Sequence, residues 1–400
     1  AGIFSPQGME VKFSYSTTFQ TSETDTDGRE LAARHAQHLF GFLHSPALVA
    51  GYNLNSDTPG IGAPRLPLTY QITQDQSRSG VRKITYKTSG ILLLHKTVAQ
   101  EILPIGAWEI TLPANLDEFY DENCTDPHYS SIGDFWYFYD PFVEGCEYLS
   151  EAPLATKVIV KIFATPKVPT DNAALDEIRS DNGNGELFQI TTINGFSEDA
   201  QNPQDDGRLS FEQVNIWLRK NGFSETVVAS YANRPILQFE KTLKKKDGSM
   251  VAVRITRLLA ETAIAKKNVT FAKFFKDAMK NADVVIYAGH SGLGGNLDIA
   301  SLEDKAGALE FTLGKQQLLF LDGCSTYSYY LSMFADRAPK NQLRILTNGL
   351  VSYFTYEPHT HIALLKRLFK VNESPTWSEV LTDMERPLRG MSYLLSVGSL

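Results

Sequence analysis

The sequence predicts an α/β fold for the second half of the chain, preceded by an α+β accessory domain. Three apolar runs carry this prediction, at residues 284–288, 318–321 and 343–346. Unbroken apolar runs of this length are typical of strands buried on both faces of a parallel sheet. Segments with helical periodicity connect them, and polar, glycine-containing loops follow the first two. Alternating strands and helices predict a wound, mostly parallel sheet flanked by helices.

The composition indicates a folded protein that does not bind nucleic acid. Four hundred residues exceed a typical single core, and 42% of them are hydrophobic, enough for two or three packed domains. Lys and Arg number 38 against 46 Asp and Glu, so the net charge is −8. Without a long basic run, the chain has little with which to neutralise phosphates. The longest apolar runs are too short to span a bilayer, so we expect no membrane span.

Residues 1–155 are expected to form the α+β accessory domain. Val11, Phe13 and Tyr15 alternate with polar residues, as in a half-buried strand. A helix is expected at residues 29–43. The further strands expected here are 83–87, 108–112 and the aromatic run 134–140. No pattern in this region indicates catalysis.

The cysteines and the first residue bear on the cellular compartment. Cys124 and Cys146 lie in one acidic, aromatic region, whereas Cys324 is far away in the sequence. In an exported protein the first two could form a disulfide, and in a cytosolic protein all three would be unrelated thiols. The chain begins with Ala1, as a mature protein does after removal of a signal peptide. We therefore expect a secreted or periplasmic protein.

Residues 156–224 are expected to form a region of their own. The strand 157–163 opens it, and this strand could also be the first of the C-terminal domain. Residues 170–207 have the Asp, Asn, Gly and Gln content of a loop. The segment 202–213 resembles a degenerate EF-hand loop, although Gln213 replaces the bidentate Glu. The sequence leaves open a bound Ca²⁺ and an Asp/Asn-rich turn that caps a helix. The candidate cation ligands are Asn202, Asp206, Arg208 and Glu212.

Residues 225–400 are expected to form the C-terminal α/β domain. Residues 236–239 and 250–255 flank a turn and predict a hairpin. Thr270 is expected to cap a helix whose apolar residues recur at helical spacing. The three apolar strands follow, and the last expected helix is 361–369.

Two loops in this domain carry residues typical of nucleophilic catalysis. Gly289 and His290 follow the first apolar strand, and Gly323 and Cys324 follow the second. Because the carboxyl ends of neighbouring parallel strands meet at one edge of a sheet, we expect the imidazole and the thiol to converge. A nearby imidazole can remove the proton of a thiol that is mostly protonated at neutral pH. The glycines would let backbone N–H groups approach a developing oxyanion.

These motifs resemble those of the caspase-like clan of cysteine peptidases, which includes caspases, metacaspases, legumain, clostripain and the gingipains. In that clan one apolar strand ends in His-Gly, and another ends in an acidic residue or Gln, a small residue and Cys. The matching strands here end in Ala-Gly-His290 and Asp-Gly-Cys324, with Ser291 in place of the usual Gly. The resemblance implies a caspase-like fold over roughly residues 230–370.

The same resemblance implies the roles of the site residues. His290 would be the general base and acid of a cysteine endopeptidase, and Cys324 its nucleophile. The N–H groups of Ser291, Gly292 and Cys324 would form the oxyanion hole. Asp322 would line the pocket for a basic residue before the scissile bond. The substrate would be a protein or peptide, and no cofactor would be required.

A serine-dependent enzyme is an alternative. Residues 289–293 also resemble the nucleophile elbow of lipases and esterases, although Leu293 replaces the second required Gly. Ser291 would then be the nucleophile, with Asp336 and either His359 or His361 as its partners.

Two further alternatives involve no covalent chemistry. A caspase-like domain without activity would be a binding protein. A metal centre could use Glu357, His359 and His361, or the helix neighbours His35 and His38, but neither set has familiar zinc spacing. Solvated or hydrogen-bonded structural histidines are favoured over a metal centre.

Overall fold

The computed structural model describes residues 2–117, 124–126, 133–146, 154–168, 173, 175–180, 187–263 and 268–400. Two compact units divide the chain: Gln7–Pro166, here the N-terminal unit, and Ala1–Pro6 with Lys167–Leu400, here the C-terminal unit. The boundary therefore lies at residues 166–167 instead of the expected 155. The region 156–224 is not separate, because it is shared between the two units.

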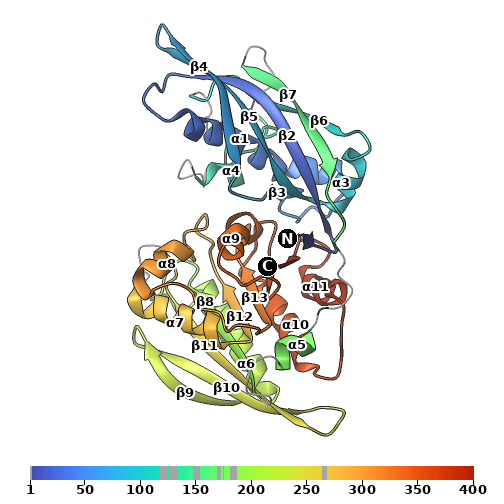
Figure 1. Ribbon diagram of the computed structural model, residues 1–400, viewed down its shortest axis with the longest axis vertical. Coiled ribbons are helices and arrows are strands. Elements are labelled where there is room, and N and C mark those ends of the chain that lie inside the picture. Colours follow the sequence, from blue (N-terminus) through green and yellow to red (C-terminus); the bar gives the residue numbers. More distant parts are fainter. Residues whose placement is uncertain are drawn as a thin grey trace. The chain divides into compact units, whose positions relative to one another are not determined.

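The N-terminal unit is an α+β arrangement built on one antiparallel sheet (Figure 1). The strand order is β3-β5-β2-β7-β6, and β4 also pairs with β5. The strands are β2 (Gly8–Thr21), β3 (Gly62–Pro64), β4 (Thr69–Arg78), β5 (Val81–His95), β6 (Ala107–Pro113) and β7 (Ala155–Ala164). The helices are α1 (Gly28–Leu43), α2 (Pro46–Gly51), α3 (Lys96–Ile102) and α4 (Phe135–Phe138).

Helix α1 covers one face of this sheet. It begins where the Asp27 side chain accepts a hydrogen bond from the Arg29 N–H. The imidazole of His35 stacks on Phe19 of β2 at 4.5 Å between ring centres and bonds the Tyr86 hydroxyl of β5 at 2.9 Å. Helix α1 thus confirms the helix expected at residues 29–43, and its apolar side lies against β2 and β5.

Two expected strands need correction. The aromatic run 134–140 contains the short helix α4, because Phe135 and Trp136 pack on α1 and Tyr139 N–H bonds the Phe135 carbonyl. The strand 157–163 is part of β7, which pairs with β2 and β6. It therefore belongs to the N-terminal unit and does not begin the C-terminal sheet.

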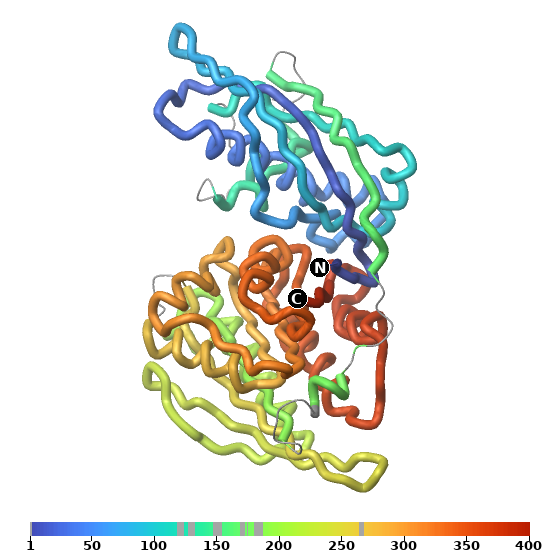
Figure 2. Tube along the Cα trace, viewed as in Figure 1, coloured from blue at the N-terminus to red at the C-terminus, as the bar shows by residue number. Residues whose placement is uncertain are grey.

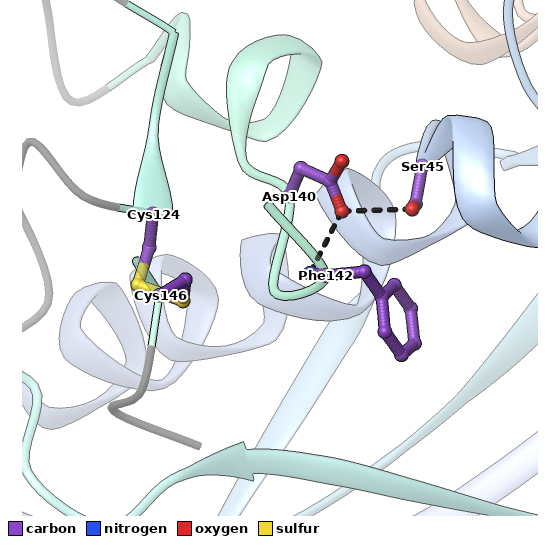
Figure 3. Close-up of a disulfide and its surroundings, with 5 residues drawn as sticks. All are labelled: Ser45, Cys124, Asp140, Phe142 and Cys146. Atoms are coloured by element: carbon purple, nitrogen blue, oxygen red, sulfur yellow. Dashed lines mark hydrogen bonds between the residues drawn. A yellow bond between two sulfur atoms is a disulfide. The ribbon is translucent and has the colours of Figure 1, made fainter. Parts of the chain in front are cut away.

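A disulfide joins Cys124 and Cys146 (Figure 3), which confirms the pairing that the sequence left open. Between the two cysteines, the Asp140 carboxylate accepts hydrogen bonds from the Ser45 hydroxyl at 2.8 Å and the Phe142 N–H at 2.9 Å. The bond from Ser45, the N-cap of α2, ties this segment to the beginning of that helix, and the bond from Phe142 closes a local turn. Cys324 is a free thiol.

The C-terminal unit contains a nine-stranded sheet with the order β1-β15-β14-β13-β12-β8-β11-β10-β9. The strands are β1 (Ile3–Phe4), β8 (Leu187–Gly195), β9 (Ser224–Tyr231), β10 (Arg234–Lys244), β11 (Met250–Ala260), β12 (Val284–Ala288), β13 (Gln317–Asp322), β14 (Leu343–Thr347) and β15 (Ser396–Ser399). The helices are α5 (Leu175–Ser180), α6 (Asp206–Lys220), α7 (Val269–Asn281), α8 (Ile299–Ala306), α9 (Thr326–Ala335), α10 (Glu357–Phe369), α11 (Trp377–Glu385) and the 3₁₀ turn η3 (Arg386–Leu388).

This sheet is mixed, not mostly parallel. Its centre, β11-β8-β12-β13-β14, is parallel, which confirms the wound arrangement of the three apolar strands. Both margins are antiparallel: β9 and β10 extend one side, and β15 and β1 extend the other. β10 and β11 form the expected hairpin. The N-terminal β1 lies beside the C-terminal β15, as Figures 1 and 2 show.

A central strand lies within the segment that was expected to be loop. Residues 187–195 form β8, which pairs with both β11 and β12, while residues 181–186 lie outside the described part of the chain. Phe188 and Ile190 of β8 are buried in the core. Because polar residues flank these apolar residues, the composition of the segment predicts a loop and not a strand.

Helices cover both faces of the parallel strands (Figure 1). Ile190, Ile286 and Phe320 join one core cluster with α6, α10 and α11. Val285 and Leu319 point to the opposite face and are also fully buried, on the side of α7. Helix α7 begins after Asn268, whose side chain accepts from the Phe271 N–H, so the cap is two residues earlier than the expected Thr270.

None of the described helices combines the length and apolar character needed to cross a membrane.

Candidate active site

His290 and Cys324 follow two neighbouring parallel strands. β12 pairs with β13 in register from Val284 with Leu318 to Ala288 with Asp322. One further bond extends this ladder, from Gly289 N–H to the Asp322 carbonyl at 3.0 Å. The two loops therefore leave the sheet side by side, as the sequence predicted.

Glycines let these loops touch. A Cβ atom on Gly323 would lie 2.5 Å from the Gly289 carbonyl oxygen and 3.5 Å from the Ser291 nitrogen. Gly289 has φ +151° and packs against Gly195 at the end of β8. A side chain at Gly323 would force the His290 and Cys324 loops apart.

Buried polar side chains fix the backbone of the loop that carries His290. The Tyr287 hydroxyl donates to the His290 carbonyl at 2.6 Å, and Asn296 Nδ2 donates to the same oxygen at 2.9 Å. The Tyr330 hydroxyl donates to the Ser291 carbonyl at 2.8 Å. The carbonyls of His290 and Ser291 are thus fixed by buried side chains, which makes the loop a rigid support for the imidazole.

The imidazole of His290 is exposed but oriented. Its Nε2 lies 2.7 Å from the Ser197 carbonyl oxygen, and its ring meets the Phe354 ring edge-on at 5.2 Å between centres. Because a carbonyl only accepts, Nε2 must carry the proton in this contact. The neutral ring then has its lone pair on Nδ1, and this is the nitrogen that can act as a base.

Asp205 fixes the carbonyl that orients His290. Its carboxylate accepts from the Ser197 N–H at 3.0 Å and hydroxyl at 2.9 Å, from the N–H groups of Glu198 and Asp199, and from Arg208 N–H as the cap of α6. Burial alone would raise the pKa of Asp205, but these donors outweigh burial and lower it to about 2. Sequence reasoning missed Ser197 and Asp205. The Asp205-Asp206 pair signals a helix start, but not the contact with the other loop.

The thiol of Cys324 is partly exposed and is held by a neighbouring segment. Its Sγ lies 3.7 Å from the Ser352 carbonyl oxygen, its one hydrogen-bond acceptor among the described residues. Burial raises the pKa of this thiol, and the negative charge of Asp322 adds to that effect although Ser352 opposes it. The thiol and the imidazole make no hydrogen bond with each other. Both nevertheless contact one short segment, Cys324 at Ser352 and His290 at Phe354.

The backbone N–H groups predicted for the oxyanion hole are available. Within the described chain, no protein acceptor engages the N–H groups of Ser291, Gly292 or Cys324. Cys324 also stands just before α9, whose N-cap Ser325 has a left-handed φ of 48°. The positive end of this helix therefore lies near the thiol, where it favours negative charge.

Asp322 does not have the role that the resemblance implies. Its side chain is buried, and its carboxylate accepts from Asn348 Nδ2 at 2.7 Å and Thr360 Oγ1 at 3.3 Å and lies 3.0 Å from His361 Nε2. It points beneath the site into the layer under α10, because these polar groups satisfy it there. A basic substrate side chain cannot reach a carboxylate enclosed in this way.

A second buried carboxylate lies in the same layer. Glu357 accepts from Ser210 Oγ at 2.6 Å and from Asn194 Nδ2 at 3.1 Å. Burial, followed by the nearby Asp322 charge, raises the pKa of Glu357 well above its usual range. Arg257 in the same layer is fully buried, and burial lowers its pKa to about 9. This layer supports the site without opening into it.

The segment 202–213 does not form a calcium loop. Helix α6 begins at Asp206, so Asp206, Arg208 and Glu212 are helical, and Gly207 packs against the Gly195 carbonyl instead of forming a sharp turn. Asn202 Oδ1 accepts from Gln204 N–H, as in an ordinary Asx turn. The capped-helix alternative is therefore confirmed. No group of three His, Cys, Asp or Glu residues in the described ranges could hold a metal ion.

The serine-dependent alternative is not assembled. Ser291 is buried, and His361 is paired with Asp322. Asp336, the C-cap of α9, and His359, on α10, are both exposed. Among the described contacts, none joins Ser291 to any of its proposed partners. His35 and His38 are buried structural residues of α1, with bonds to the Pro113 and His35 carbonyls respectively.

Comparison with known proteins does not assign the chain to a family. No protein-family model matches it, and no curated protein is significantly similar to it.

Proposed function

We propose that the protein is a cysteine peptidase of the caspase-like type, with Cys324 as nucleophile and His290 as general base and acid. The observation that carries this proposal is the meeting of two loops at neighbouring strand ends. They bring together a partly exposed thiol, an imidazole in a fixed tautomer and the unengaged N–H groups of Gly292 and Cys324. These are the groups that acyl transfer to a thiol needs.

In this mechanism the thiol leaves the Ser352 carbonyl and transfers its proton to His290 Nδ1. The thiolate attacks the scissile carbonyl carbon, and the oxyanion that forms accepts hydrogen bonds from the two N–H groups. The imidazolium returns the proton to the leaving amine as the C–N bond breaks. Water, activated by the neutral imidazole, then hydrolyses the thioester and releases the free Cys324 thiol.

The proposed substrate is a protein or peptide. The expected preference for a basic residue before the scissile bond depended on Asp322, which is enclosed by Asn348, Thr360 and His361. We therefore propose the peptidase activity without that preference. The disulfide between Cys124 and Cys146 fits an oxidising compartment, which supports the proposal that the protein is secreted or periplasmic.

The test is turnover of a fluorogenic tetrapeptide library varied at the residue before the scissile bond. We expect cleavage that Cys324→Ala abolishes and that the matched variant Ser332→Ala, on α9, does not change. Iodoacetamide should modify Cys324, and a fluorophosphonate should not modify Ser291. Cleavage that survives in Cys324→Ala but is lost in Ser291→Ala would contradict the proposal.

A catalytically inactive caspase-like binding protein is the second candidate. It is favoured by the hydrogen bond from the thiol to Ser352 instead of to His290, and by the raised pKa of Cys324. In that case no peptide in the library would be cleaved, although the fold and the accessibility of Cys324 to iodoacetamide would be unchanged.

A further inference from the structure

A large hollow lies on the sheet of the N-terminal unit, whereas Cys324 and His290 belong to the C-terminal unit. It has a volume of about 1170 Å³. It crosses β4, β5, β2 and β7. Most of its lining residues alternate with Phe19 and Tyr86, which face α1, so they lie on the opposite face of the sheet. Arg29, in the first turn of α1, also lines the hollow. We call this hollow the sheet groove.

Small hydroxyl residues make the floor of the sheet groove. Strand pairing places Thr69 beside Ser89, Ser89 beside Ser14, and Ser14 beside Lys161. The next row contains Gln71, Lys87 and Ser16. Directly paired residues of an antiparallel sheet share a face, so these side chains all point into the groove. Short side chains in the middle and long lysines beside them give the surface its hollow form.

The lining of the sheet groove is basic in an acidic protein. It contains Arg29, Lys87, Lys157 and Lys161, and no Asp or Glu among the described lining residues, although the whole chain has a net charge of −8. Lys157 pairs with the exposed Glu109. Arg29, Lys87 and Lys161 have no ion-pair partner within the described ranges. An unneutralised cluster of this kind attracts a ligand with several negative charges.

Apolar side chains interrupt the lysines along β7. Ile159, between Lys157 and Lys161, is 52% exposed, and Phe163 beyond them is 50% exposed. The face continues to a second hollow of about 400 Å³, lined in part by Thr18, Gln20 and Lys83. Alternating charged and apolar contacts over such a length match an extended polypeptide that carries both acidic and apolar side chains. A polyphosphate backbone or an acidic polysaccharide would leave Ile159 and Phe163 without apolar contacts.

We propose that the sheet groove is a docking site for an extended acidic polypeptide segment. Its carboxylates pair with Lys87 and Lys161, and its intervening apolar side chains contact Ile159. This site is independent of the proposed peptidase activity, so either can fail without the other.

The test is fluorescence anisotropy with a labelled twelve-residue peptide in which every second residue is alternately Glu or Val, with Thr between them, so that one face of the extended peptide carries both kinds of side chain. The full chain is used with Cys324→Ala, so that cleavage cannot remove the probe. We expect binding that weakens with added salt, and no binding of the same peptide with Gln in place of Glu. Lys87→Gln and Lys161→Gln should each weaken binding about three- to fivefold, and together about tenfold or more.

Two controls decide between this site and general charge attraction. Lys220→Gln removes an exposed cation from α6 of the other unit and should leave the affinity unchanged. Ile159→Ser should weaken binding of the peptide but not of heparin. The proposal is overturned if Lys220→Gln weakens binding as much as Lys161→Gln does. It is also overturned if the peptide does not bind, or if heparin or single-stranded DNA binds more tightly than the peptide and is unaffected by Ile159→Ser.

Discussion

The histidines of the two units have opposite surroundings. His35, His38 and His44 in the N-terminal unit are buried among aromatic rings, and burial lowers the pKa of His35 and His44 to about 4. His290 in the C-terminal unit is exposed at the end of β12, with one nitrogen on the Ser197 carbonyl. The buried rings must stay neutral for the fold to form, whereas the ring of His290 is accessible to a substrate. Burial, and not residue type, therefore separates a structural histidine from a candidate base.

His290→Ala tests most directly whether the exposed histidine is a catalytic base. We expect peptidase activity to fall by a factor of roughly 100 to 10,000, because the variant lacks the group that accepts the thiol proton. The melting temperature should stay close to that of the wild type, since the imidazole is exposed. The measurement is kcat/KM with the best library peptide, alongside thermal unfolding. His359→Ala, which removes another exposed histidine of the same unit, should retain full activity.

The reverse result is expected for His35→Ala. This variant removes a buried ring and its hydrogen bonds to the Tyr86 hydroxyl and the Pro113 carbonyl, so it should destabilise the protein by about 2–4 kcal/mol. Activity per folded molecule should not change.

The stability of the N-terminal unit in the wild type should fall as the pH drops from about 6.5 toward 4, because over that range the unfolded chain binds protons that buried His35 does not. Urea unfolding at several pH values measures both effects, and an increase in stability toward pH 4 would contradict the second.

Alkylation at different pH values tests whether Cys324 is a neutral thiol or a thiolate. Because burial raises its pKa, the thiolate fraction should increase about tenfold for each pH unit below that pKa. The rate of iodoacetamide modification at Cys324, followed by mass spectrometry, should therefore keep rising through pH 8. A rate that is already constant below pH 7 would mean that the thiolate exists as an ion pair with His290, contrary to the contact with Ser352.

Asp205→Asn tests how His290 is positioned. The neutral amide keeps the size of the carboxylate but cannot accept all of its hydrogen bonds, so the Ser197 carbonyl should lose its fixed position. We expect a loss of roughly tenfold in kcat with little change in KM, and about 1 kcal/mol in stability from the weakened helix cap. The matched control is Thr376→Ala, which removes the N-cap of α11 and has no contact with His290. The kcat loss of Asp205→Asn should exceed that of this control. Equal effects from the two variants would show that Asp205 acts only as a cap.

The smallest effect is expected at Glu357. Its raised pKa means that the fold favours the protonated carboxyl, so its contribution to stability is lost as the pH rises through that pKa. Glu357→Gln retains the neutral form and should make the protein slightly more stable at pH 9 than the wild type, with little difference near pH 5. Thermal unfolding at the two pH values measures this, and a destabilised variant at pH 9 would contradict it.

Several features were predictable because neighbours in the chain determine them. The apolar runs at residues 284–288, 318–321 and 343–346 became parallel strands, and the glycines after the first two made close loops. Other features depended on contacts between distant segments. Asp322 is two residues before Cys324 in the sequence, yet its carboxylate turns toward Asn348 and His361. Nothing local distinguishes it from a residue that faces a pocket.

The sequence by itself determined the strand-and-loop pattern that places His290 and Cys324 at one edge of a sheet, because apolar periodicity and glycine act through local backbone physics. Tertiary structure alone decided which polar groups are enclosed and which stay accessible. It placed β8 in a segment with loop composition, directed Asp205 to Ser197, and gave the lysines of β5 and β7 a common face. Hydrogen bonding and charge act between segments far apart in the chain, so their outcome is fixed only when the chain has folded.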